Sequence, residues 1–360
     1  MSIRQLTSNE LDQAGEARLY RAMRHFWLPV MLGVELPSGS PRPAVLLGEQ
    51  LALARMDGAV RCFADRCAYR GAALSLGSVQ DGELECACHG WTYGPDGRCT
   101  AMPARFGSVI PRHGQLRCYR AEERYGIIWA CLSPEPALPL PGFPEFGSAA
   151  FRVTMGPVYE WKCSAHRRVE NFVDFAHFAW VHDGVLGSHD QPEVTDHQVW
   201  REGPALRFTR QVAEPLSGFT KLAAGDSGGW VDVGYDYALA MPLTVHFTRT
   251  TLPGGDCYAL LMSASPAGPR LTRSFWALAR NYALDEPDEE FMRFERLVQE
   301  QDRPVVESQR PEMLPFDLSA ELHIRGADKV SVEYRRWLVE LAGQLEPPVP
   351  ATGTAGRAQR

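Results

Sequence analysis

The sequence predicts an α+β protein in which a small all-β unit precedes an antiparallel sheet arranged around a long C-terminal helix. Three observations predict this class. Short β-type segments with turn dipeptides fill the first third of the chain, alternating segments fill residues 206–279, and apolar residues recur at helical spacing in 287–301. A proline-rich stretch at 134–142 reads as an extended linker between the two units.

The first unit begins with a helix predicted over residues 1–25. Its expected strands are Ala44–Gly48, Leu51–Arg55, Val60–Ala64 and Gly126–Leu132. The dipeptides Asp57-Gly58, Asp81-Gly82 and Asp96-Gly97 are typical of two-residue hairpin turns. These elements predict a lead-in at 1–43, a first domain at 44–142, a second domain at 143–345 and a disordered tail at 346–360.

The second unit opens with a strand predicted over 151–161 and a helix expected to carry Asp174 and His177. Alternating segments then predict sheet strands at Leu206–Val212, Trp230–Leu239, Thr244–Thr251, Cys257–Ser263 and Thr272–Ala279. The final predicted element is a helix over 287–301, in which apolar residues recur on one face.

Composition excludes several classes of function. The 360 residues carry a formal net charge of −7 and no cluster of basic residues, which argues against nucleic-acid binding. No apolar run is long enough for a membrane span, and the N-terminus lacks the apolar core of a signal peptide, so a cytoplasmic location is expected. Five of the nine cysteines lie between Cys62 and Cys99, which favours metal ligation over disulfides in such a chain.

The second unit contains a candidate metal-binding motif. Asp174, His177 and His182 form a D-x2-H-x4-H pattern. Two imidazoles and one carboxylate, with open positions for oxygen, are the ligands of many non-haem Fe(II) oxygenases. In a regular helix the two histidines would lie about 140° apart around the axis. We therefore expect the helix to be distorted or to end near them, and Gly184 is consistent with an end.

Two loops of the first unit offer a second set of ligands. Cys67 precedes Tyr69 by two residues, and Cys86 precedes His89 by three. A Rieske [2Fe–2S] centre takes two cysteines on one iron and two histidines on the other. Cys67, Cys86 and His89 fit this pattern, whereas Tyr69 stands where the first histidine is expected.

Together with the segments Pro95–Cys99 and Tyr125–Trp129, these motifs resemble the α subunits of Rieske non-haem iron oxygenases, the aromatic-ring hydroxylases and oxidative demethylases. The resemblance runs from about Phe26 to Gln309. It implies a Rieske domain followed by a helix-grip-like catalytic domain. The implied cofactors are a [2Fe–2S] cluster and a mononuclear Fe(II).

The resemblance also implies roles for individual residues. His177 and His182 correspond to iron ligands, and Asp302 matches the family's third ligand, with Glu300 and Glu307 as rival carboxylates. Asp174 corresponds to an acid that hydrogen-bonds an iron ligand and the cluster histidine of a neighbouring subunit, here His89. Glu170 and Asn171 are expected to line the site.

The implied reaction uses O2 and electrons from a separate NAD(P)H reductase or ferredoxin to oxidise a small organic substrate, either aromatic or aliphatic. Hydroxylation or oxidative demethylation is favoured over ring dihydroxylation because the chain is short. A homotrimer is the form that the resemblance implies. A catalytically silent relative, or an electron carrier that uses only the first domain, is the rival interpretation.

Tyr69 leaves three interpretations open. A tyrosinate binds iron in place of imidazole, Cys88 supplies a third thiolate, or the cluster is impaired or absent. The last is favoured, because iron with a missing ligand is usually labile.

Overall fold

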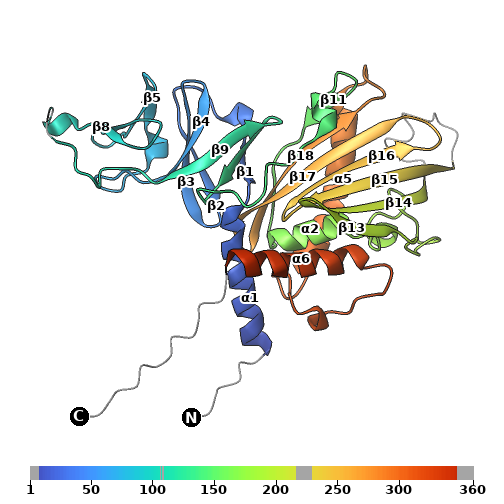
Figure 1. Cartoon of the computed structure of the whole chain (residues 1–360). Helices are drawn as coiled ribbons and strands as arrows, with labels where there is room; N and C mark the ends of the chain where they lie inside the picture. The colour runs from blue at the N-terminus through green and yellow to red at the C-terminus, as the bar shows by residue number, and fades with distance from the viewer. Residues whose placement is uncertain (1–7, 106, 108, 216–228, 347–360) are drawn as a thin grey trace, which may run out of the picture.

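The computed structural model describes residues 8–346 apart from 106, 108 and 216–228, and it has the predicted α+β architecture (Figure 1). The expected N-terminal helix is present as α1 (Ser8–Ala22), followed by a short 3-10 turn at Met23–His25. Residues 1–7 of that predicted helix and residues 347–360 of the predicted tail lie outside the described residues.

The N-terminal half contains a six-stranded sheet and a four-stranded sheet. The larger sheet has the spatial order β1 (Leu28–Leu32), β10 (Ile127–Cys131), β9 (Cys118–Arg124), β4 (Ala59–Ala64), β3 (Glu49–Met56) and β2 (Arg42–Leu46). The smaller one is β5 (Ser78–Gln80), β6 (Glu83–Glu85), β7 (Thr92–Tyr93) and β8 (Cys99–Ala101).

Two of the predicted hairpin turns have the backbone that their sequence favours. Asp57 and Gly58 have φ values of 50° and 78°, and Asp81 and Gly82 have 50° and 74°. Positive φ at both central residues is the signature of the type I′ turn, which matches the twist of the flanking strands. The turns connect β3 to β4 and β5 to β6, and the second pair belongs to the smaller sheet.

The C-terminal half is built on one eight-stranded antiparallel sheet. Its path is β11 (Arg152–Met155), β18 (Leu271–Arg280), β17 (Cys257–Gly268), β16 (Thr244–Thr251), β15 (Trp230–Ala240), β14 (Ala205–Pro215) and β13 (Gln198–Glu202), with β12 (Tyr159–Trp161) also paired to β18.

The single strand predicted over 151–161 is wrong, because β11 and β12 are separate strands. Between them Gly156 lies on the Trp276 ring, so closely that a Cβ there would be 1.9 Å from a ring atom. The Gly156 N–H donates to the Trp276 carbonyl, and the Trp276 indole donates to Pro157 O. The backbone therefore leaves the strand path to pass over this side chain.

The α-helices among the described residues of this half are α2 (Ala165–Val173), α3 (Phe178–Val181), α5 (Asp288–Ser308) and α6 (Lys329–Leu345). Helix α5 is the predicted C-terminal helix, longer at its end than the periodicity indicated, and its buried residues are Phe291, Glu295, Gln299, Asp302 and Val306. Their spacing of three or four residues places them on one face. Helix α6, which was not predicted, contacts α1 and α2.

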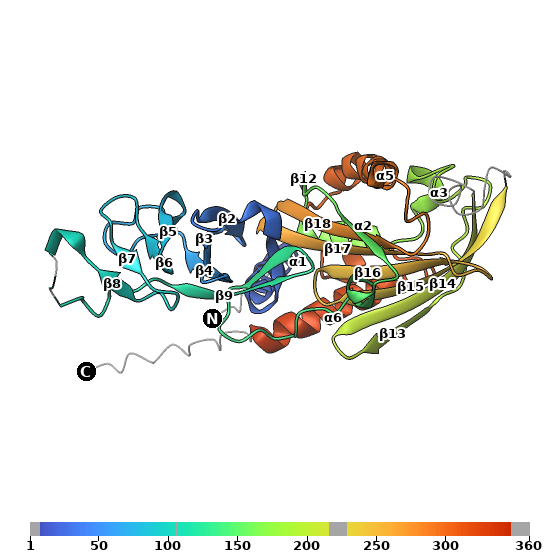
Figure 2. The same cartoon turned by 90° about the horizontal axis from the view of Figure 1, so that it is seen from above.

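The two halves are joined tightly, while the smaller sheet projects away from the junction (Figure 2). One apolar core contains Leu28 and Leu46 of the first half together with Val245 and Leu260 of the second. The N–H groups of Leu47 and Gly48 also donate to the carbonyls of Pro266 and Ala267, at 2.7 and 3.0 Å. Among the described helices, none combines the length and apolarity needed to cross a membrane.

Candidate functional site

The segment that carries the two histidines is not one helix. Helix α2 ends at Val173, and Asp174 is extended, with φ −83° and ψ 130°. Its side chain accepts a hydrogen bond from the Ala176 N–H at 2.8 Å, the local turn with which aspartate competes with helical bonding. The expectation of a helix carrying Asp174 and His177 is therefore wrong.

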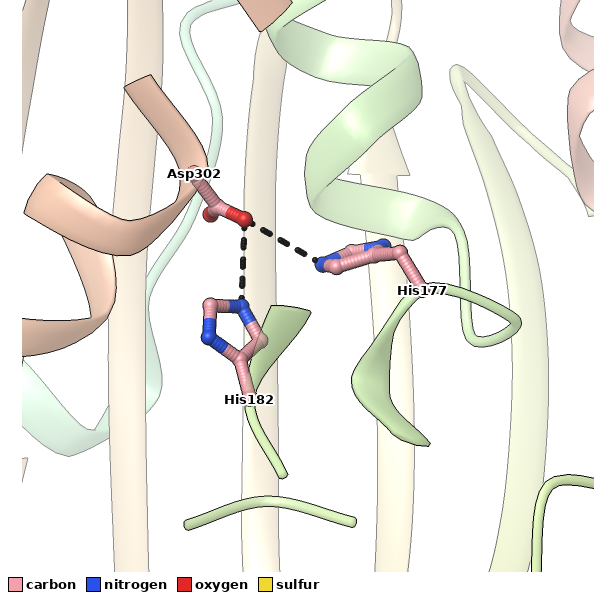
Figure 3. A group of neighbouring side chains, drawn as sticks. All are labelled: His177, His182 and Asp302. Carbon is pink, nitrogen blue, oxygen red and sulfur yellow. Dashed lines mark ion pairs between the residues drawn. The ribbon is translucent and has the colours of Figure 1, made fainter. Parts of the chain in front are cut away.

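This break resolves the angular problem posed by the five-residue spacing. His177 lies at the N-cap of the short helix α3, and His182 lies at its C-cap. Both imidazoles turn toward α5, where Asp302 projects from the buried face (Figure 3). Oδ1 of Asp302 lies 3.4 Å from Nε2 of His177 and 3.1 Å from Nε2 of His182.

The three donor atoms form a compact set. They lie within 4.8 Å of one another, and in the described part of the chain this is the one group of three His, Cys, Asp or Glu ligand atoms gathered so closely. Of the rival carboxylates, Glu307 accepts a bond from the Lys162 N–H at 2.9 Å, and Glu300 is exposed. The donor set of two imidazoles and one carboxylate fits a divalent iron with open positions.

The opposite nitrogen of each histidine is also held. Nδ1 of His177 lies 3.2 Å from Oδ2 of Asp174, and Nδ1 of His182 lies 2.8 Å from Oε1 of Gln301. Such contacts fix the tautomer and ring orientation of metal-ligating histidines. The role of Gln301 was missed in the sequence, although its position next to Asp302 was a usable signal.

Electrostatics in the triad favour a cation. Burial lowers the pKa of His177, but hydrogen bonds to Asp174 and Asp302 outweigh burial and raise the pKa to about 9. Burial raises the pKa of Asp302, and its contacts with both histidines hold the pKa below the ordinary value. A proton thus stays on His177 in the metal-free triad, and a bound cation would displace it.

A pocket opens beside the triad. Its apolar and aromatic lining includes Phe172, Phe178, Leu186, Phe247, Leu260, Phe294 and Val298. His177, His182 and Asp302 form part of the same wall. A pocket that is mostly apolar, with a few convergent polar groups, is the usual form of a small-molecule site.

Two carboxylates in the pocket wall, Glu214 and Glu295, are hydrogen-bonded to neighbouring polar side chains. Glu214 accepts hydrogen bonds from the guanidinium of Arg249 at 2.9 and 3.0 Å and from the Tyr235 hydroxyl at 2.5 Å. Glu295 accepts a hydrogen bond from Tyr258. Burial raises the pKa of Glu295 to about 7, although the Tyr258 bond lowers it.

Arg168 is a buried cation in the wall of the pocket. It donates to Asn171 Oδ1 and Gln299 Oε1, both at 2.9 Å, and Asn171 Nδ2 donates to Asp302 at 3.3 Å. Asn171 therefore lines the site as expected. Glu170 does not, because Arg335 of α6 binds both of its carboxylate oxygens at 2.6 and 2.8 Å.

The loops of the smaller sheet bring together the other predicted ligands. Cys67 and Cys86 are buried, with 4% and 1% exposure, and their side chains lie within hydrogen-bonding reach of each other. The Tyr93 hydroxyl lies 3.1 Å from the Cys67 sulfur. Cys88 and His89 are exposed on the second loop, and their backbone groups contact Cys86.

Tyr69 lies beside His89 on the tip, which is formed by the loops at residues 67–71 and 86–90. The two rings are 5.1 Å apart, edge to face, and Tyr69 is 45% exposed. The donors fit a Rieske centre at Cys67, Cys86 and His89 but not at the fourth position, where a phenol replaces an imidazole. The four-ligand set is thus incomplete.

Comparison with known proteins covers both halves. Residues 26–120 match the Rieske [2Fe-2S] domain, and residues 161–344 match the vanillate O-demethylase oxygenase C-terminal domain. The chain is 34% identical over 325 residues to methylxanthine N1-demethylase NdmA of Pseudomonas putida, covering 89% of each chain. It is 32% identical over 337 residues to methylxanthine N3-demethylase NdmB of the same organism, covering 89% of this chain and 90% of that one.

A solved structure of NdmA superimposes with a TM-score of 0.79 at 33% identity, covering 90% of this chain and 92% of that one. The dicamba monooxygenase structure has a TM-score of 0.75 at 21% identity, covering 89% and 98%, and supports the fold alone.

Proposed function

Because the chain belongs to the Rieske non-haem iron oxygenases, whose cofactors are a Rieske [2Fe–2S] cluster and a mononuclear iron, we propose that it is an oxidative N-demethylase of a small planar heterocycle. The observation that carries this proposal is the triad of His177, His182 and Asp302 in the wall of an aromatic pocket. The methylxanthine demethylases among its relatives support N-methyl groups as the point of attack.

The three triad residues would hold the mononuclear iron. When bound there, Fe(II) supplies the activation of O2 that no protein side chain provides. Asp174 and Gln301 keep Nε2 of each histidine turned toward Asp302. The protein thus contributes a preset ligand geometry and a largely apolar pocket.

The pocket lining supports a flat aromatic substrate. Phe172, Phe247 and Phe294 contribute aromatic rings to the lining, while Glu295 and Gln299 of α5 contribute polar groups. Aromatic side chains recognise planar rings by stacking, and a few polar groups fix the orientation of the ring. With its pKa raised to about 7, Glu295 keeps a proton at neutral pH on a large fraction of molecules, so it can donate to a ring carbonyl or nitrogen.

The overall reaction balances as R–N–CH3 + O2 + 2 e⁻ + 2 H⁺ → R–N–H + HCHO + H2O. Oxidation of the methyl carbon breaks the N–C bond, and the released nitrogen takes a proton. The electrons require a partner. We propose a separate NAD(P)H reductase, alone or through a ferredoxin.

We also propose a head-to-tail homotrimer. The smaller sheet and helix α3 lie at opposite ends of one subunit (Figure 2). His89 is in the connection between β6 and β7 of that sheet, and Asp174 lies shortly before α3. Asp174 keeps 31% of its side chain exposed and His89 is exposed, so both are accessible to a neighbouring copy. Light scattering after size exclusion tests this arrangement, and a monomer at micromolar concentration would contradict it.

The function is tested with hydrogen peroxide, which supplies the oxygen and both electrons without a reductase or a cluster. The iron-loaded chain is incubated with peroxide and either caffeine or vanillate, and formaldehyde and demethylated product are measured. We expect turnover of the N-methyl compound and none of the O-methyl compound. Preference for vanillate would overturn the proposed substrate class.

The rival function is a catalytically silent binding protein. It predicts that the iron-loaded chain binds caffeine in calorimetry but releases no formaldehyde when peroxide is added. The triad argues against it, because all three donors and both of the contacts that orient the histidines are present.

A further inference from the structure

The tip is asymmetric between its sulfur side and its nitrogen side. On the sulfur side, both loops have the same closure, in which the N–H of Gly71 donates to Cys67 O and that of Gly90 donates to Cys86 O, both at 2.9 Å. Backbone groups of Cys88 and His89 contact the Cys86 sulfur, and Tyr93 contacts the Cys67 sulfur. This half is built to hold two thiolates.

On the nitrogen side, packing within the tip sets the orientation of Tyr69. Its ring stacks on Trp91 at 4.8 Å with an interplanar angle of 8°. The Arg70 guanidinium lies 5.2 Å from the ring centroid. Aromatic stacking and a cation–π contact orient this ring without any metal.

Tyrosine also differs from the histidine expected at this position in where its donor atom lies and in the charge of that atom. An imidazole nitrogen adjoins Cγ, whereas a phenol oxygen lies at the far end of the ring, so a loop of the same length presents the donor farther out. Tyrosinate would also add a negative charge to a centre whose nitrogen side normally carries neutral ligands.

We infer that Tyr69 is a stacking residue outside the coordination shell, and that the tip supplies three protein ligands, Cys67, Cys86 and His89, to a cluster that needs four. A single change, Tyr69→His, would then complete the ligand set. This inference goes beyond the proposed demethylation and does not depend on it.

The test measures the centre itself after anaerobic reconstitution with iron and sulfide. Iron and acid-labile sulfide per chain, the visible absorption spectrum and the EPR spectrum of the dithionite-reduced protein are compared for the unaltered chain, Tyr69→Phe, Tyr69→His and Cys88→Ser. Tyr69→Phe is the matched variant, because it keeps the ring and its stacking but removes the only atom that can bind iron.

Tyr69→Phe should match the unaltered chain in iron, sulfide and spectrum. Tyr69→His should gain at least twofold in sulfide, approach about two irons and two sulfides beyond the catalytic iron, and give a Rieske spectrum. Cys88→Ser should have the same iron content, sulfide content and spectrum as the unaltered chain.

Three results would overturn the inference. The first is that Tyr69→Phe loses a tyrosinate–iron absorption band or more than half of its sulfide. The second is that Cys88→Ser loses more than half of its sulfide. The third is that Tyr69→His gains no sulfide. Near-ultraviolet circular dichroism and the melting temperature confirm that each variant is folded. Peroxide-driven demethylation does not use the cluster, so failure there bears on the proposed function alone.

Discussion

The two predicted iron-binding regions differ in burial and in completeness. The triad has all three donors, and His182 and Asp302 are buried. Asp174 and Gln301 contact the Nδ1 atoms of the two histidines and orient their rings. The tip has buried cysteines, but its nitrogen side is exposed and one histidine position is a tyrosine.

From this difference we expect the tip to fold without its full ligand set. An apolar cluster that includes Leu74, Leu84, Trp91 and Tyr93 surrounds Cys67 and Cys86. The triad is the opposite case, because its donors are themselves part of a buried polar network. A substitution at the triad should therefore disturb far more than one at the tip.

The largest expected effect is loss of the catalytic metal. Asp302→Ala removes the one carboxylate that faces both histidines, so bound iron should fall from about one per chain to less than about a tenth, and peroxide-driven formaldehyde release should stop. Iron is measured by plasma emission after desalting. Glu300→Ala, which removes an exposed acid two residues away, should retain both properties. Full iron content in Asp302→Ala would rule out this triad as the metal site.

The second effect concerns Glu295 and pH. Its pKa is raised from 4.5 to about 7 by burial, so its contribution to stability is complete below pH 4.5 and is lost as pH rises through 7. The loss should be on the order of 3 kcal/mol, and Glu295→Gln should not show it.

Urea unfolding of the metal-free proteins at pH 5, 6, 7 and 8 measures this difference. Glu289→Gln, at an exposed acid on the same helix, is the control and should follow the unaltered chain. Identical pH profiles for Glu295→Gln and the unaltered chain would show that the buried carboxyl does not titrate in this range.

A smaller effect is expected at Gln301. Gln301→Leu removes the acceptor at Nδ1 of His182, and the loss of such an orienting contact weakens metal affinity about 10- to 100-fold. Fe(II) titration under anaerobic conditions gives the affinity. Gln301→Glu keeps an acceptor and should restore most of it, whereas equal losses in both variants would point to a packing defect instead.

The smallest effect is expected at the tip. Tyr69→Ala removes a half-exposed ring that stacks on Trp91, so the free energy of unfolding of the metal-free protein should fall by about 0.5–1.5 kcal/mol. Chemical denaturation monitored by circular dichroism measures this change. A loss as large as that of a core truncation would contradict the idea that the tip folds independently of its nitrogen-side ligands.

Periodicity predicted the antiparallel sheet and the apolar face of α5. Ligand spacing singled out Cys67, Cys86 and His89, whose role as cluster ligands stays a prediction. The position of Asp302 came from family resemblance, and the structure brings it to the two histidines.

Features that depend on tertiary contacts were not visible. At the break between α2 and α3 the Asp174 side chain accepts a hydrogen bond from the Ala176 N–H, a local turn that competes with helical bonding. Glu295 lies seven residues, or two turns, before Asp302 on the same helix face, a signal that could have been used. The pairing of Glu214 with Arg249 joins two strands and has no local signature.

The shared core between the halves limits how a defective tip can be repaired. Because Leu28 and Leu46 pack in one cluster with Val245 and Leu260, and backbone bonds join residues 47 and 48 to 266 and 267, a chimaera with a relative's N-terminal half would cut through tightly packed side chains. Cleaving the chain at 134–142 would likewise leave two fragments that stay associated through this shared core and these backbone hydrogen bonds. Point substitution, rather than exchange of modules, is the route open to evolution or to an engineer.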